Sequence, residues 1–426
     1  MGSGTKIDGN DGDVTITAFV NIELGLVTTS ANANLTTIIG AISDANGGSN
    51  NIDATNVSLL AGAGIGLGDA LETTISAVAG DSGSGGLFLA NTGTLDIGYG
   101  GSVLDLTVGD ASTITSTGTI SVKEYLLAFG NSGTIRVEST GGNVEMDPLT
   151  EIYGGDGDLE VIADGNVELG LLTTTANVTV EATNGAISDA NGDPANNINA
   201  TNVTLTAATG AGVGDALETT ISALEANTGS GGLFLDNTGT LDIGYVGGTL
   251  TGVMVGGASR IESDGTMTVK ENITASGGNL DLENTSGNFV LDSGVTISNG
   301  AFKVWIESDN DLTVNGTVQT VGEEIRLRAD NDLILGANSL VDTTSAASVF
   351  LTANYDGIGG GAFTQTDGGT SLVDAQGGNL NVDAEGDVKI TNLQSAGGSV
   401  TIFTYDGSIL DNTSLSEAPL VVADEL

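Results

Sequence analysis

The sequence contains no cysteine and no histidine, and only three prolines among 426 residues. Without cysteine no disulfide can form, and without either residue the common ligands of zinc, haem iron, iron–sulfur clusters and copper are missing. Cysteine nucleophiles and histidine-dependent catalytic triads are excluded for the same reason. Any metal site must therefore be built from oxygen ligands, which suit calcium or magnesium.

Basic residues are also scarce: nine Lys and Arg stand against 55 Asp and Glu, giving a formal net charge of −46. Phosphate backbones and anionic membrane surfaces are bound by clusters of Lys and Arg, so we expect neither nucleic acid nor a lipid surface as a partner. No run of 18 apolar residues is present, which argues against membrane insertion. The N-terminal residues, MGSGTKIDGNDGD, have neither the basic region nor the apolar region of a secretory signal.

Small and aliphatic residues are abundant. The chain has 67 glycines, 39% hydrophobic residues and a mean hydropathy of +0.16, while aromatic residues make up only 4%. An acidic disordered chain would combine its charge with low hydrophobicity. This composition instead predicts a chain that buries a core of Val, Ile and Leu.

One long segment of the sequence occurs twice. The two copies are separated by roughly 145 to 147 residues, and identity this extended indicates a duplicated structural unit. The matching segments are GAISDANG (Gly40–Gly47 and Gly185–Gly192), GDALETTISA (Gly68–Ala77 and Gly214–Ala223), GSGGLFL (Gly83–Leu89 and Gly229–Leu235) and NTGTLDIGY (Asn91–Tyr99 and Asn237–Tyr245).

A shorter period lies inside this unit. Apolar and polar residues alternate over three to six positions, bounded by Gly, Asn or Asp, which is typical of half-buried strands. Examples are Leu280/Leu282, Val304/Ile306 and Ile325/Leu327. Strand starts recur roughly every 8 to 13 residues, which predicts coils of about 20 residues with two or three strands each.

The fold prediction is all-β: a right-handed parallel β-helix, or β-solenoid, forming an elongated rod of roughly 20 coils. A string of β-sandwich domains is the competing fold, but linker-like composition and hairpin turns at fixed spacing are scarce. We expect one continuous solenoid with an N-terminal coil at 1–19, beginning with an MGSG sequence of the kind left by cloning. Long repeat units would follow at 20–164 and 165–310, with further coils at 311–426. Within GDALETTISA, the spacing of Leu71, Thr74 and Ile75 predicts a short helix or excursion.

The segments GDALETTISAL, SGGLFLDNTGTLDIGYVGG and IESDGTMTVKENITASGGNLDLEN resemble the repeat region of large bacterial exoproteins and adhesins of the filamentous-haemagglutinin-like type. The resemblance covers about residues 12 to 410. It implies a right-handed parallel β-helix that projects a binding tip from the cell, and a secreted or cell-surface location. The chain departs from that family in lacking a recognisable secretion domain and anchor.

Calcium is the one cofactor that the sequence suggests. Asp11 and Asp13 in DGNDGD, and Asp156 and Asp158 in GGDGD, place carboxylates two residues apart on Gly-rich turns, where oxygen ligands can converge on a hard cation. The second segment approaches a calcium-binding nonapeptide, but Leu159 stands where that repeat has aspartate. The alternative interpretation is a solvated acidic turn beside a strand.

A polysaccharide-processing enzyme is the alternative from another functional class. Arg326 and Arg328 in EEIRLRADND are the only close pair of cations, with Asp330 nearby, and carbohydrate-cleaving enzymes use carboxylates at defined separations. Alternation places both arginines on the outer face, where a surface ion-pair patch is the simpler explanation.

Taken from the residues and the resemblance, the expected function is a non-catalytic, rigid β-helical stalk of a secreted or cell-surface adhesin. Its partner would be a cell-surface or matrix glycan or protein, and lateral self-association is left open. A calcium-dependent surface-binding module is the third hypothesis.

Overall fold

The computed structural model describes residues 1–2, 4–100, 103–130, 133–192, 194–413 and 420–425. The chain forms an all-β parallel β-solenoid of about 17 turns with nearly no helix, and the predicted fold class is confirmed. The turns are fewer than the sequence predicts because each turn is, on average, longer than the expected coil. Among the described residues there is no helix of the length and apolarity needed to cross a membrane.

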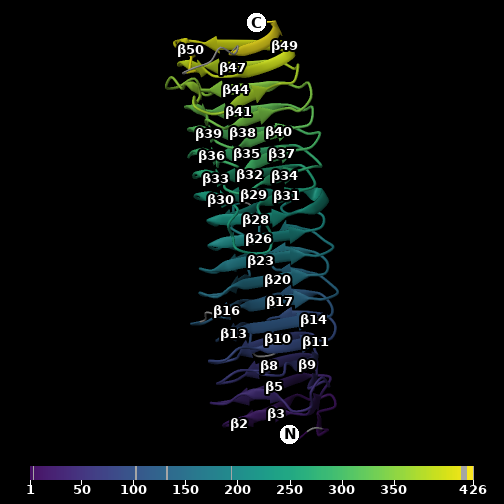
Figure 1. Ribbon diagram of the computed structural model, residues 1–426. Coiled ribbons are helices and arrows are strands. Elements are labelled where there is room, and N and C mark those ends of the chain that lie inside the picture. The colour runs from purple at the N-terminus through teal and green to yellow at the C-terminus, as the bar shows by residue number, and fades with distance from the viewer. Residues whose placement is uncertain (3, 101–102, 131–132, 193, 414–419, 426) are drawn as a thin grey trace. The chain divides into compact units, whose positions relative to one another are not determined.

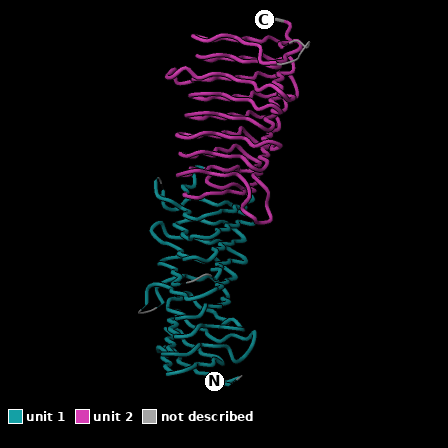
Figure 2. Tube along the Cα trace, turned by 60° about the vertical axis from the view of Figure 1, so that its left-hand side comes forward, with its two compact units in different colours: residues 1–208, 214–219 teal, residues 209–213, 220–426 magenta. Residues whose placement is uncertain are grey.

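Two compact units make up the chain, and Figure 2 distinguishes them by colour. Unit 1 comprises residues 1–208 and 214–219, and unit 2 comprises residues 209–213 and 220–426. In each unit the strands of successive turns are stacked side by side (Figure 1).

The strands of unit 1 are β1 (Lys6–Asp8), β2 (Val14–Ala18), β3 (Ile22–Leu24), β4 (Leu26–Thr28), β5 (Asn32–Thr37), β6 (Ile42–Asp44), β7 (Ile52–Asp53), β8 (Asn56–Leu60), β9 (Leu71–Thr74), β10 (Ala77–Asp81), β11 (Phe88–Asn91), β12 (Leu95–Ile97), β13 (Leu106–Val108), β14 (Ser112–Ser116), β15 (Ile120–Val122), β16 (Leu126–Ala128), β17 (Ile135–Ser139), β18 (Val144–Met146), β19 (Glu151–Tyr153), β20 (Leu159–Ala163), β21 (Val167–Leu169), β22 (Leu171–Thr173), β23 (Asn177–Ala182), β24 (Ile187–Asp189), β25 (Ile198–Asn199) and β26 (Asn202–Ala207). Strand β27 (Leu217–Thr220) includes residues of both units.

The elements of unit 2 are β28 (Ala223–Asn227), the short 3-10 helix η1 (Gly229–Gly231), β29 (Phe234–Asn237), β30 (Leu241–Ile243), β31 (Val253–Val255), β32 (Ser259–Ser263), β33 (Met267–Val269), β34 (Ile273–Ala275), β35 (Leu280–Asn284), β36 (Phe289–Leu291), β37 (Thr296–Asn299), β38 (Val304–Ser308), β39 (Leu312–Val314), β40 (Thr317–Thr320), β41 (Ile325–Ala329), β42 (Leu333–Leu335), β43 (Leu340–Asp342), β44 (Val349–Ala353), β45 (Phe363–Gln365), β46 (Leu372–Asp374), β47 (Leu380–Ala384), β48 (Val388–Ile390), β49 (Leu393–Thr404), β50 (Ile409–Asp411) and β51 (Val421–Glu425).

A typical turn holds three strands, so each strand pairs in parallel with the third strand after it. In unit 1, β17 pairs with β20, β18 with β21 and β19 with β22. In unit 2, β32, β35, β38, β41, β44 and β47 form one continuous ladder. Parallel register places equivalent residues of successive turns above one another, which produces rows of like-facing side chains.

The position of the core follows from the alternation of apolar and polar residues along each strand. In β38 and β41 the apolar residues Val304, Ile306, Ile325 and Leu327 are fully buried, while the residues between them are half-buried on the outer face. Close stacking also requires small residues at turns: a Cβ on Gly277 would lie 1.6 Å from the carbonyl oxygen of Gly256 in the preceding turn. Glycine is therefore a packing requirement at this position.

The predicted helix in GDALETTISA is wrong, because residues 71–74 form strand β9. Leu71, Thr73 and Ile75 are all buried and lie two residues apart, which is the period of a strand. Asn91 holds the segment by accepting hydrogen bonds from the Thr73 hydroxyl at 2.9 Å and the Ile75 amide at 3.0 Å. A buried polar partner from the next turn thus makes threonine compatible with an inward position.

Candidate functional site

The DGNDGD segment of unit 1, which contains Asp11 and Asp13, is hydrogen-bonded to the next turn of the solenoid. One carboxylate oxygen of Asp13 accepts hydrogen bonds from the backbone amide and the side-chain amide of Asn32, both at 3.1 Å. Asp11 accepts a bond from the Ser30 hydroxyl at 3.0 Å. These carboxylates therefore satisfy donors at the start of strand β5.

The second acidic turn, which precedes strand β20, repeats this arrangement. Asp158 accepts bonds from the backbone amide of Asn177 at 3.1 Å and from its side-chain amide at 2.9 Å. Asp156 accepts a bond from the Thr175 hydroxyl at 3.0 Å. Both predicted pairs thus connect adjacent turns, and this role needs only the protein's own donors.

No group of three or more Asp or Glu side chains is placed to hold a metal ion within the described part of the chain. Asp11, Asp13, Asp156 and Asp158 each accept a hydrogen bond from a residue of the next turn of the solenoid. Calcium binding at these four residues stays a prediction.

The outer face of unit 2 carries a row of aromatic and basic side chains. Parallel register places Trp305, Arg326 and Phe350 on β38, β41 and β44, one per turn. The guanidinium carbon of Arg326 lies 5.0 Å from the Trp305 ring centre and 5.7 Å from that of Phe350. Sandwiching between two aromatic rings is a cation–π arrangement. The outward orientation expected for Arg326 and Arg328 is confirmed.

Glu324 lies at the centre of the polar contacts of this row. It pairs with Arg326 at 2.8 Å and Lys303 at 3.7 Å, and it accepts the indole N–H of Trp305 at 3.0 Å. Asp330 is not part of this network, because in the described part of the chain Arg326 forms its ion pair with Glu324 and not with Asp330. Burial raises the pKa of Asp330, and the nearby carboxylates of Asp356 and Asp309 raise it further. The structure therefore does not unite Arg326 and Asp330 in one site.

Towards the N-terminal side of the same ladder, Asp281 stands between Arg260 and Trp305 in register. Arg260 donates hydrogen bonds to Asp236 at 3.1 Å and Glu283 at 3.2 Å. Burial raises the pKa of Asp281 to about 6, and the neighbouring carboxylates of Glu283 and Glu307 act in the same direction.

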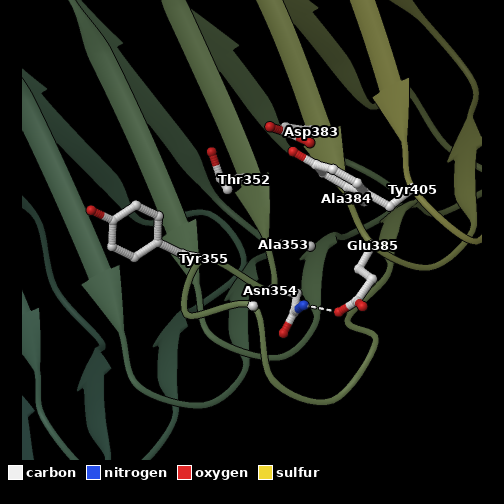
Figure 3. A pocket seen from close by; sticks show the side chains of 9 residues that line it. Thr352, Ala353, Asn354, Tyr355, Asp383, Ala384, Glu385 and Tyr405 are labelled. Carbon is white, nitrogen blue, oxygen red and sulfur yellow. Dashed lines mark hydrogen bonds between the residues drawn. The ribbon is translucent and has the colours of Figure 1, made fainter.

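Beside this row lies a hollow of about 460 Å³. Figure 3 shows its lining side chains, with Tyr405 beside Asp383 on one side and Tyr355 on the other. The hollow lies where β44 and β47 end, and it is lined by Thr352, Ala353, Asn354, Tyr355, Gly357, Asp383, Ala384, Glu385 and Tyr405.

Sequence reasoning missed this hollow. Asn354, Asp383 and Tyr405 are far apart along the chain. They meet because β44 pairs with β47 and β47 pairs with β49, the strand that Tyr405 follows. No local motif specifies these pairings. The signal available in the sequence was two tyrosines, Tyr355 and Tyr405, in a chain with only 4% aromatic residues.

Comparison with protein-family models, with curated proteins and with solved structures found no match. The β-solenoid fold, its internal repeats and the surface described above are therefore the basis for the functional argument.

Proposed function

We propose that this chain is a non-catalytic structural and interaction segment of a secreted or cell-surface bacterial adhesin. In this proposal it is a rigid β-helical stalk that recognises a cell-surface or matrix glycan or protein. The observation that carries the proposal is the in-register stacking of turns in each unit. A ladder such as β32 to β47 supports each strand on both sides by parallel pairing.

The arrangement of the charged side chains supports a non-catalytic role. Arg326 is held by Glu324 and two aromatic rings, and Arg328 is held by Glu307 at 3.0 Å. A base or electrophile acting on a glycan must be within reach of the substrate and of its acid partner. The pairing of these arginines within the surface fits a stabilising role, because opposite charges on adjacent turns offset the repulsion of a very acidic molecule.

The resemblance to filamentous-haemagglutinin-like adhesins supports the location and the class of partner. The experiment uses beads coated with the purified chain and counts their attachment to cultured host cells and to arrayed matrix glycans and proteins. We expect attachment above that of beads coated with an unrelated acidic protein. Attachment at the level of those control beads contradicts the adhesin proposal.

The enzyme alternative is tested on the same preparation. The chain is incubated with neutral and acidic polysaccharides, and reducing ends and unsaturated products are measured. We expect no release. Product formation that disappears in Arg326→Ala or Asp330→Ala would replace the stalk proposal with a polysaccharide-processing function.

A further inference from the structure

The surface of unit 2 already holds one cationic group between a tyrosine and a carboxylate. The guanidinium carbon of Arg328 lies 4.1 Å from the ring centre of Tyr355, and the same guanidinium pairs with Glu307 at 3.0 Å. A ring face on one side and a carboxylate on the other are the two contacts by which proteins hold guanidinium and ammonium groups.

The hollow beside it offers the same two contacts. Register places Arg328, Thr352 and Asp383 in one row on β41, β44 and β47. The short side chain of Thr352 leaves space where a longer residue would stand, and Tyr405 lies beside Asp383 (Figure 3). Among the described residues, no Lys or Arg forms an ion pair with Asp383, and burial raises the pKa of this carboxyl.

A buried amide in the wall of the hollow also has an unused acceptor. Asn354 is 8% exposed and adopts a left-handed backbone conformation with a φ of 60°. Its side-chain nitrogen donates to Glu385, which also accepts the backbone amide of Gly360 at 3.2 Å. Its side-chain oxygen has no hydrogen-bond partner among the described residues. This oxygen is shielded from solvent, and it is an exception to the rule that buried polar atoms are normally paired.

We propose that this hollow binds the guanidinium or alkylammonium group of an Arg or Lys side chain on a partner polypeptide. Asp383 supplies the countercharge, and the exposed ring of Tyr405 supplies the cation–π surface. This inference goes beyond the stalk proposal, because it concerns one site on unit 2 and holds whether or not the whole chain bears load.

Charge and size favour this class of ligand. A molecule with a formal net charge of −46 repels anionic groups and raises the local concentration of cations. A hollow of about 460 Å³ exceeds the need of a single inorganic ion and is in the size range of small organic ligand sites.

The test uses saturation-transfer NMR on the full chain at about 0.15 M ionic strength, where diffuse surface attraction is screened. The probes are N-acetyl-arginine amide and N-acetyl-lysine amide, with N-acetyl-citrulline amide as a neutral probe of the same shape. We expect both cationic probes to bind and the citrulline probe to bind roughly tenfold more weakly, because it cannot form a charge-assisted bond. Equal binding of citrulline and arginine overturns the proposal, and the two cations show whether Arg or Lys is preferred.

Variants separate the site from the general acidity of the molecule. Asp383→Asn removes the countercharge, and Tyr405→Leu removes the ring without changing charge; we expect Tyr405→Leu to weaken binding about two- to fivefold. Tyr405→Phe keeps the ring and should retain binding.

The matched control is Asp53→Asn, which removes a carboxylate from a hollow of about 280 Å³ in unit 1 that has no aromatic lining residue. We expect this change to leave probe binding unaltered. Equal losses in Asp53→Asn and Asp383→Asn, with none in Tyr405→Leu, would show diffuse attraction only and overturn the proposal. Thermal unfolding of each variant verifies that it is folded.

Discussion

Single residues on the turns connect one coil to the next. Asp158 is the clearest example, because one of its oxygens accepts two hydrogen bonds from Asn177. Loss of both bonds leaves a strand-initiating amide without its acceptor. The same geometry at Asp13 and Asn32 shows that the duplication preserved the contact as well as the sequence.

Replacing this carboxylate tests that role. We expect Asp158→Ala to lower the free energy of unfolding by about 1 kcal/mol, because both bonds to Asn177 are lost. Asp158→Asn retains a side-chain oxygen and should cost less. Urea unfolding monitored by circular dichroism measures both. Equal destabilisation by the two substitutions would show that the charge, and not the acceptor, is what matters.

The half-buried carboxyl of Asp281 predicts a pH dependence. Its pKa is about 6 in the folded protein against an ordinary value of 3.8, so the folded state holds more protons between these values. Stability should therefore fall as pH rises from about 4 to 6, by about 1 kcal/mol after allowance for partial solvent screening.

Asp281→Asn removes this titration. We expect the variant to be more stable than the parent chain at pH 7 and to show a smaller change in urea midpoint between pH 4 and pH 7. An unchanged pH profile in the variant would mean that another group is responsible.

Individual strands show why some of the structure could be predicted from the sequence. Apolar and polar residues alternate in segments such as Leu280/Leu282 and Ile325/Leu327, because one face of a half-buried strand is in the core and the other faces solvent. This alternation predicts both the strands and the face on which each side chain lies. Strand β9 was mistaken for a helix because Thr73 is inward, and its partner Asn91 comes from the next turn.

The register between strands of successive turns could not be predicted from the sequence, for a related reason. Leu159 pairs with Val178, whereas Val349 pairs with Leu380, so the stretch of chain between paired strands differs widely from one turn to another. The number of residues in the loops between strands sets the register, and a solenoid tolerates longer loops at its surface. The acidic turns and the outward arginines were therefore foreseeable as local patterns, whereas the hollow beside Tyr405 was not.

The free energy of unfolding should depend strongly on the packing of core side chains within a single turn. Phe289 on β36 is fully buried, with Met267 and Leu312 in register before and after it. We expect Phe289→Ala to cost about 3–5 kcal/mol through lost burial and a cavity. The neighbouring outward residue gives the control: Val290→Ala should cost less than about 1 kcal/mol. Similar costs at both positions, measured by urea unfolding, would contradict the assigned faces.

At the scale of the whole molecule, the charge of −46 dominates the response to solution conditions. Self-repulsion should be relieved by salt, so the melting temperature should rise as sodium chloride increases from about 0.01 to 0.15 M. At fixed ionic strength, replacing part of the sodium with millimolar calcium separates screening from specific binding.

Specific calcium binding predicts a further rise that chelator removes and that Asp156→Asn or Asp158→Asn reduces. A rise that persists in both variants assigns the effect to the diffuse acidity of the surface. A melting temperature that is insensitive to sodium chloride would contradict self-repulsion as a destabilising force.

The stalk proposal is tested most directly by single-molecule force spectroscopy with a handle at each end of the chain. A rigid stack of turns should hold its length as force rises and then lengthen in steps. Because the chain is divided among about 17 turns, each step should be a multiple of roughly 85 Å, the extended length of one turn. Smooth extension from the lowest forces, as for a flexible chain, would contradict the account.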